Sequence, residues 1–212
     1  MKSTAFDYKK ENKDLYMPKG APALVTVPPM HFIMANGKGD PNTSPMFGEA
    51  VSLLYGFAFT IKMSKMGKVQ PEGYFDFVVP PLEGLWWIEG GEFALNDREN
   101  WCWTLMLRQP EFVNSGVFEW AGQEIKRKKP EQQIGLARFE SFDEGLCVQA
   151  MHKGAYSKEP ETMAKISDFI VQNGLIDTVS SGGLHHEIYL SDQRRGKPEN
   201  MKTVLRHPVT CL

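Results

Sequence analysis

The sequence predicts an α+β protein in which a β-α-β-β unit occurs twice, forming one curved mixed or antiparallel sheet. Short stretches recur: "MANGKGD" at 34–40 resembles "MHKGAYS" at 151–157, and "LRQP" at 107–110 resembles "LRHP" at 205–208. Each half also shows the same order of strand and helix patterns, which indicates an internal duplication. We expect helices on one face of the sheet and a ligand cleft on the other.

The first unit covers about 21–110. Pro28 and Pro29 suit an edge or a bulge, so an extended entry should lead into a strand over 30–36. Thr43 or Ser44 can cap a helix that has Pro45 at its first position and ends near 65–68. Strands are predicted over 74–79, 85–88 and 100–109.

The second unit covers about 135–209 and follows a connector helix over 111–129. One or two strands are predicted between 136 and 152, then a helix that ends at Asn173–Gly174, a left-handed cap. The last two strands fall at 184–192 and 201–209. Residues 1–20 are polar and are expected to lie on the surface as an arm, so 21–212 form a single domain.

Composition excludes several classes of protein. The 212 residues carry a formal net charge of −2, which argues against non-specific nucleic-acid binding. The basic run at 126–130 is interpreted as the solvated end of a helix. Three cysteines without a C-x-x-C motif support neither a disulfide framework nor a zinc site. We expect a cytoplasmic protein without metal or cofactor, since no signal or membrane-length apolar run occurs. It should be a monomer or a weak homodimer paired through an edge strand.

Four of the five tryptophans fall within eighteen residues, which is the first sign of a binding site. They are Trp86, Trp87, Trp101 and Trp103. Any one indole is more simply explained as core. As a group they favour a wall that binds flat apolar or cationic molecules.

The second sign is an acid in the middle of a predicted strand. Strand alternation places His185, Glu187 and Tyr189 on one face, with His186 and Ile188 on the other. Burying an unpaired carboxylate is costly. Glu187 is therefore either a structural residue, exposed at a sheet edge or ion-paired with Arg194, Arg195 or Arg206, or a counter-ion or general base in an aromatic cleft.

Four further residues complete the candidate site. Glu83 is a second carboxylate, in a proline-flanked segment beside the Trp pair, with a solvated turn as the alternative. Tyr156 follows a strand end and either overlies the cleft or caps the core. Tyr55 and His185 are added as ligand contacts. Motifs for phosphate binding, zinc proteases or serine hydrolases are absent from the sequence.

Five segments resemble the GyrI-like small-molecule-binding proteins, relatives of the effector-binding domain of BmrR-type multidrug regulators. They are "VVPPLEGLWW" (78–87), "WCWTLMLRQPEFV" (101–113), "MHKGAYSKEPETM" (151–163), "HHEIYLSDQRR" (185–195) and "KTVLRHPV" (202–209). "PPLEGLWW" with "HHEIYLSD" is typical of the stand-alone branch, although "SDQRR" stands where "SDPRR" is expected. The resemblance implies a duplicated fold whose cleft takes bulky planar, lipophilic or cationic compounds around an acid that maps onto Glu187.

The resemblance also implies a reaction. Some stand-alone members hydrolyse the cyclopropane ring of DNA-alkylating antibiotics of the yatakemycin and duocarmycin type. Glu187 would then activate water, and Tyr189, Tyr156 or an indole would supply a hydrogen-bond donor. With no DNA-binding domain ahead of it, the chain does not resemble a complete transcription regulator. The alternatives are a non-catalytic multidrug-binding, sequestering or sensing module, and an interaction module that uses an open sheet face.

Overall fold

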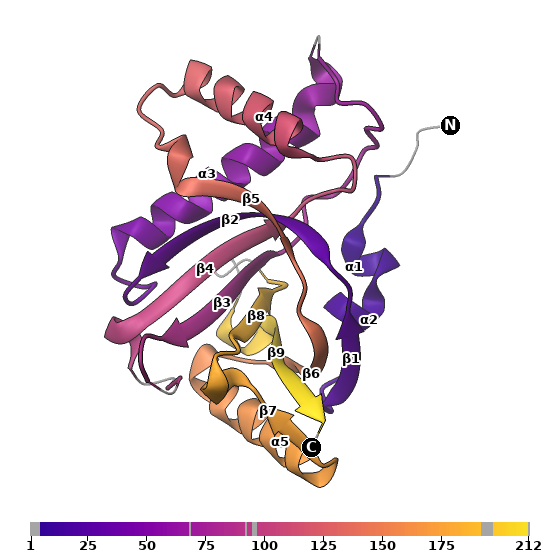
Figure 1. Ribbon diagram of the computed structural model, residues 1–212, viewed down its shortest axis with the longest axis vertical. Coiled ribbons are helices and arrows are strands. Elements are labelled where there is room, and N and C mark those ends of the chain that lie inside the picture. The colour runs from indigo at the N-terminus through magenta and orange to yellow at the C-terminus, as the bar shows by residue number, and fades with distance from the viewer. Residues whose placement is uncertain (1–4, 68, 92, 95–96, 192–196, 212) are drawn as a thin grey trace.

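The computed structural model describes residues 5–67, 69–91, 93–94, 97–191 and 197–211, and these form one antiparallel sheet with helices (Figure 1). Its nine strands are β1 (Ala23–Val27), β2 (Met30–Lys38), β3 (Leu82–Ile88), β4 (Trp101–Arg108), β5 (Ala137–Phe142), β6 (Gly145–Lys153), β7 (Leu175–Asp177), β8 (His185–Tyr189) and β9 (Lys202–Cys211). The predicted fold class is confirmed.

The strand order reveals how the two units combine. It runs β1-β6-β9-β8-β3-β4-β2-β5, with β7 also paired to β9. β3 and β8 join the units at the centre of the sheet. At the edges the units exchange strands, since β1 pairs with β6 and β5 pairs with β2. Only Pro28 and Pro29 separate β1 from β2, so the sheet must curve to bring its two ends near each other.

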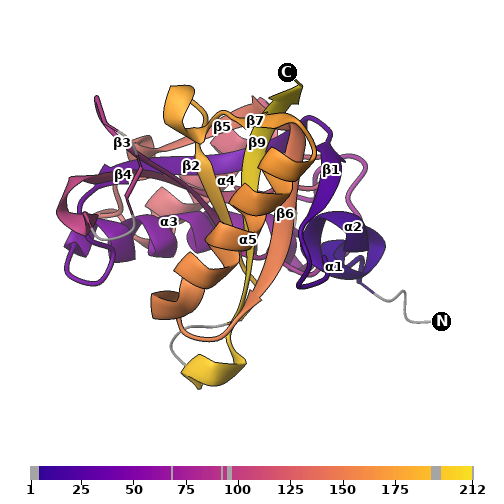
Figure 2. The same ribbon diagram turned by 90° about the horizontal axis from the view of Figure 1, so that it is seen from below.

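Three long helices lie on one face of the sheet: α3 (Pro45–Lys62), α4 (Ser115–Lys128) and α5 (Glu159–Gln172). α3 packs on β2 and β4, and α4 packs against α3, in a core that includes Leu54, Phe57 and Leu105. α5 packs on β6 and β9 through Ile166 and Ile170 (Figure 2). None of the helices in the described ranges is long and apolar enough to cross a membrane.

Six short 3-10 helices occur in the connections that the structure describes. They are η1 (Met63–Met66), η2 (Arg98–Asn100), η3 (Ile134–Leu136), η4 (Tyr156–Lys158), η5 (Val179–Ser181) and η6 (Pro198–Asn200). Of these, η2 and η4 matter most below, because they border the same cavity.

The face of the sheet away from the long helices is filled by the N-terminal segment. There α1 (Tyr8–Glu11) and α2 (Lys13–Tyr16) insert Tyr8, Leu15 and Tyr16, each at most 5% exposed, into a second apolar core. The expectation of a surface arm is therefore wrong for these side chains. The expectation of a cleft on this face is also wrong, because the segment occupies the space.

Several predicted boundaries change, and one predicted strand is absent. Residues 74–79 form only a single bridge, Phe77 with Phe6, because β8 and β2 already occupy the outer edges of β3 and β4. β3 begins at Leu82 rather than 85, so Glu83 belongs to a strand and not to a loop. α4 begins at Ser115 after an Asn114 cap, later than the predicted 111. β7 was not predicted.

Candidate functional site

A cavity of about 260 Å³ opens on the helix-covered face, between the start of α3 and the start of α5. β3, β4 and β8 form its floor. It is lined by Pro41, Asn42, Phe47, Trp86, Arg98, Trp101, Tyr156, Ser157, Glu159, Pro160, Glu187 and Tyr189. The cavity therefore brings together residues of both units, at the line where β3 meets β8.

Two of the four predicted tryptophans form one wall. The rings of Trp86 and Trp101 meet edge to face, with centroids 5.1 Å apart. Phe47 stacks on Trp86 with centroids 6.1 Å apart. The guanidinium carbon of Arg98 lies 5.6 Å from the centre of a Trp101 ring, a cation–π contact at the rim. The wall can hold a flat aromatic system.

The other predicted aromatic contacts lie outside this cavity. Trp87 follows Trp86 in a strand, so it projects from the opposite face and borders a separate hollow. Trp103 is fully buried, and its ring fits over Gly37, where a Cβ would lie 2.1 Å from the indole. Tyr55 stacks on Phe59 of the same helix. The structure therefore does not place these three side chains in the cavity.

Glu187 faces the cavity and is 5% exposed. Its Oε1 lies 3.1 Å from His185 Nε2, and its Oε2 accepts a 2.6 Å hydrogen bond from the Tyr189 hydroxyl. Trp86 Nε1 donates to the Tyr189 oxygen at 3.1 Å. Both carboxylate oxygens are therefore held in place by side chains of the same strand.

Tyr189 is held protonated by its place in this network. Burial raises its pKa well above the usual value, and the charge and hydrogen bond of Glu187 act in the same direction. Gly84, the cross-strand partner of Glu187, permits the arrangement. A Cβ there would lie 2.8 Å from Trp86 Nε1 and 3.2 Å from the Tyr189 hydroxyl.

Glu159 is a second carboxyl in the cavity, and sequence reasoning missed it. It begins α5, is 4% exposed, and its Oε1 is buried without a hydrogen-bond partner among the described residues. Burial raises its pKa to about 9; the Glu187 charge adds to this effect and Arg98 opposes it. Glu159 is therefore a carboxylic acid at neutral pH. An acid followed by Pro160 looks in the sequence like an ordinary helix start.

Tyr156, from η4, does line the cavity as expected. Its ring meets the Tyr189 ring edge to face, with centroids 6.3 Å apart. His185 is different: it is fully buried and lies behind Glu187 rather than in the cavity. Its Nδ1 is 2.9 Å from His207 Nε2. It thus supports Glu187 instead of lining the ligand's space.

Glu83 lies on the other face of the sheet and is fully buried there. Tyr16 donates to its Oε1 at 3.1 Å, and His186 Nε2 lies 3.0 Å from its Oε2. The network continues through Glu144 to Arg206, which also bonds the Leu15 carbonyl. Among the predicted partners of Glu187, Arg206 therefore belongs to this network, and Arg194 and Arg195 lie outside the described residues.

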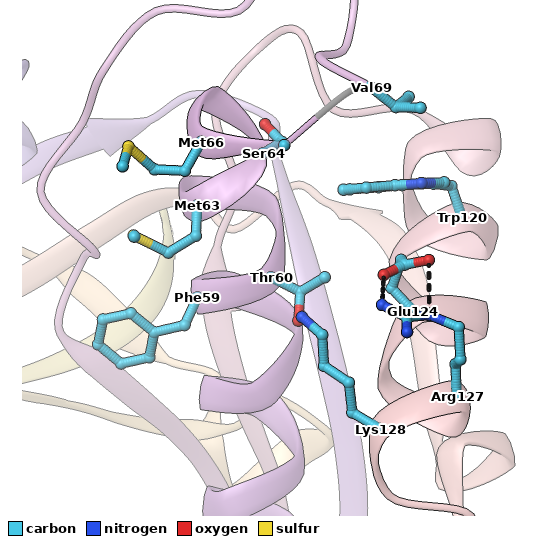
Figure 3. A pocket seen from close by; sticks show the side chains of 11 residues that line it. Phe59, Thr60, Met63, Ser64, Met66, Val69, Trp120, Glu124, Arg127 and Lys128 are labelled. Carbon is cyan, nitrogen blue, oxygen red and sulfur yellow. Dashed lines mark hydrogen bonds and ion pairs between the residues drawn. The ribbon is translucent and has the colours of Figure 1, made fainter.

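A larger hollow, about 660 Å³, lies between α3 and α4 (Figure 3). Phe59, Met63 and Met66 border it on one side and Trp120 on the other. The Glu124–Arg127 ion pair, 2.9 Å apart, is at its rim. Its lining offers exposed charges and apolar surface but no buried titratable group. The smaller cavity at Glu187 is therefore the candidate functional site.

A family model for the GyrI-like small-molecule-binding domain matches residues 21–210. The chain belongs to this family. No curated protein matches it.

Solved structures agree with this assignment. An uncharacterized conserved protein from Listeria innocua is 49% identical, with a TM-score of 0.92, covering 97% of this chain and 100% of its own. A hydrolase from the same organism is 48% identical, with a TM-score of 0.91, covering 98% and 100%. The C-terminal domain of EcmrR is 14% identical, with a TM-score of 0.53, covering 90% and 98%, and shares the fold.

Proposed function

We propose that this protein binds bulky planar lipophilic or cationic compounds and hydrolyses those that carry a reactive cyclopropane, a detoxifying reaction. The observation that carries the proposal is Glu187: a carboxylate with two hydrogen bonds, facing a cavity with an indole wall. Membership of a small-molecule-binding family and the similarity to a Listeria hydrolase support it.

The reaction adds one water to a cyclopropane conjugated to a dienone. Glu187 takes a proton from water as the oxygen bonds to a cyclopropane carbon. The adjoining C–C bond breaks, and its electron pair moves through the ring to the carbonyl oxygen, which becomes a phenolate. The protonated Glu159 transfers its proton to that oxygen. Because burial raises the pKa of Glu159 to about 9, Glu159 is suited to the role of acid and leaves the role of base to Glu187.

The cavity also limits how the compound lies. Its volume of about 260 Å³ lies just below the usual range for small-molecule sites, roughly 300–1,000 Å³. The reacting ring therefore occupies the cavity between Trp86, Trp101 and Glu187, and the rest of a bulky compound extends past Pro41 and Asn42.

The test is the Glu187→Gln variant with a cyclopropane-bearing dienone, whose chromophore reports ring opening. Loss of a general base should slow turnover by about 10²–10⁴-fold, with binding retained by calorimetry. Glu124→Gln, at the rim of the separate hollow between α3 and α4, is the control and should match the wild type. If Glu187→Gln opens the ring at the wild-type rate, Glu187 is not the base.

A non-catalytic binder is the second candidate, favoured by the family's description as small-molecule binding alone. In that case flat cationic dyes bind tightly and quench the fluorescence of Trp86 and Trp101, and mass spectrometry finds no hydrolysed product. Glu187 then acts as the counter-ion, and the Glu187→Gln variant binds cationic dyes more weakly while its affinity for neutral dyes changes less.

A further inference from the structure

Glu187 is the inner end of a chain of four hydrogen-bonded groups that reaches the molecular surface. His185 Nε2 lies 3.1 Å from Glu187 Oε1, and His185 Nδ1 lies 2.9 Å from His207 Nε2. His207 Nδ1 lies 2.6 Å from Asp177 Oδ2. His185 and His207 are buried, and the Asp177 side chain is 30% exposed. We call these four residues the relay.

Three elements of the second unit build the relay. β8 and β9 are adjacent strands, so His185 and His207 point from the same face of the sheet. β7 pairs with the far end of β9 and brings Asp177 alongside His207. The backbone N–H of Val179 donates to the Asp177 side chain at 2.9 Å, and Phe93 stacks on His185 with centroids 4.9 Å apart. The Asp177 side chain and the His185 ring are thus held in place.

The hydrogen bonds of the relay fix the number of protons that it holds. Three hydrogen bonds link two carboxylates through four ring nitrogens, and each bond requires one hydrogen. Two neutral imidazoles carry only two N–H groups. With both carboxylates ionised, the histidine pair must therefore hold a third proton and a positive charge. Burial lowers the pKa of His185, although the Glu187 hydrogen bond opposes this. We therefore expect His207, which lies between His185 and Asp177, to be the ring that donates through both nitrogens.

We propose that His207 and Asp177 are positioning residues that act through His185 to hold Glu187 in place as the base of this cavity. The positive charge of the histidine pair lies between Glu187 and Asp177. Glu187 therefore has a hydrogen-bonded cationic partner, whereas Glu159 has no hydrogen-bond partner for its Oε1 among the described residues. The relay therefore decides which of the two carboxyls is the base. This inference rests on the proposed function for its effect on rate.

The charged and titratable groups around the relay are consistent with this assignment. Around Glu187 lie Tyr189 on its own strand, Tyr156 from η4 and Glu159 from the start of α5. The guanidinium of Arg98 acts on Glu159 in turn. His185 also senses the charge of His186 behind the sheet. Burial would raise the pKa of Asp177, but the hydrogen bond and charge of His207 lower it below its usual value.

The rate test uses two variants of the outer relay. His207→Gln removes the outer imidazole with its positive charge, and Asp177→Asn removes the carboxylate that stabilises this charge. The acid limb of kcat/KM should move up by about one pH unit, a roughly tenfold loss on the acidic side that recovers as pH rises. Asp76→Asn is the control, because Asp76 is an ion-paired carboxylate of similar exposure, 29%, far from the cavity. A loss of equal size at every pH, or an unchanged profile, would overturn the proposal.

A second measurement does not depend on turnover. Nitrogen-15 NMR of the wild type at neutral pH should show an imidazolium for His207 and a neutral Nε2–H form for His185, with each signal assigned by its loss in a His→Gln variant. Two neutral rings at His185 and His207 would refute the relay. If NMR finds the imidazolium while Glu187→Gln turns over normally, the relay stands and the proposed hydrolysis fails.

Discussion

Glu83 and Glu187 lie on neighbouring strands but on opposite faces of the sheet. In the β3–β8 pairing Glu83 stands beside Ile188, and Gly84 stands beside Glu187. A one-residue step along a strand reverses the face, so one carboxylate meets the cavity and the other meets the N-terminal helices. The two buried acids therefore have separate tasks: Glu187 belongs to the candidate site, and Glu83 anchors the N-terminal segment.

Glu83→Ala should destabilise the fold by about 3–5 kcal/mol, since it leaves the buried charge of His186 without one of its two carboxylates. The Tyr16 hydroxyl loses its acceptor as well. Urea unfolding monitored by circular dichroism measures the loss. At urea concentrations below the unfolding transition of the variant, its ligand affinity should stay within about twofold of the wild type. A stable variant with weak binding would instead assign Glu83 to the site.

Glu159→Gln should raise stability in a pH-dependent way. The folded-state pKa of Glu159 is raised to about 9, so folding binds a proton between the ordinary pKa and that value. Wild-type stability therefore falls as pH rises through this window, by about 1 kcal/mol per pH unit for this group. Glutamine cannot ionise, and the gap between variant and wild type should widen from pH 5 to pH 9 in thermal unfolding. A constant gap would contradict a buried neutral acid.

Trp101→Leu should weaken binding of a planar ligand by about tenfold or more, because it removes one wall of the cavity. Trp87→Leu is the matched control, since Trp87 is an indole on the opposite face of the same sheet. Isothermal titration calorimetry avoids reliance on tryptophan fluorescence. Equal losses for the two variants would show that the ligand does not lie against Trp101.

The Glu144–His186–Arg206 network should make the protein sensitive to acid. Burial would raise the pKa of Glu144, but the charges of His186 and Arg206 lower it to about 2. A depressed carboxyl contributes stability above its unfolded pKa and loses it as pH falls through the folded value. Wild-type stability should therefore drop by about 3 kcal/mol between pH 5 and pH 2 from this group. Glu144→Gln should flatten that slope, whereas the exposed neighbour Asp143→Asn should not.

Strand alternation was the most reliable guide in the sequence. It correctly placed His185, Glu187 and Tyr189 on one face and His186 on the other, as the two separate hydrogen-bond networks show. It also put Trp101 and Trp103 on the same face. What alternation cannot say is what covers each face. Trp103 lies under α3 and Trp101 beside a cavity, and that difference depends on where a helix begins.

The residues that sequence reasoning missed share a physical cause. Glu159, His207 and Asp177 lie in three different elements and meet Glu187 or its neighbours only through tertiary packing. Each has an ordinary local explanation: a helix start, a proline-adjacent strand end and a loop acid. The burial of Tyr8 and Tyr16 was hidden in the same way, because a polar segment with scattered tyrosines carries no periodic pattern.

The crossed edges of the sheet carry a consequence for the two halves of the chain. β1 completes the second unit and β5 completes the first, so the molecule has the connectivity of a domain-swapped dimer fused end to end. A half expressed alone would have an unpaired strand edge, and its own exchanged strand, β1 or β5, would lack the strand with which it pairs. The candidate cavity straddles the seam between the two units: Glu187 and its relay come from the second unit, and Trp86 and Trp101 come from the first.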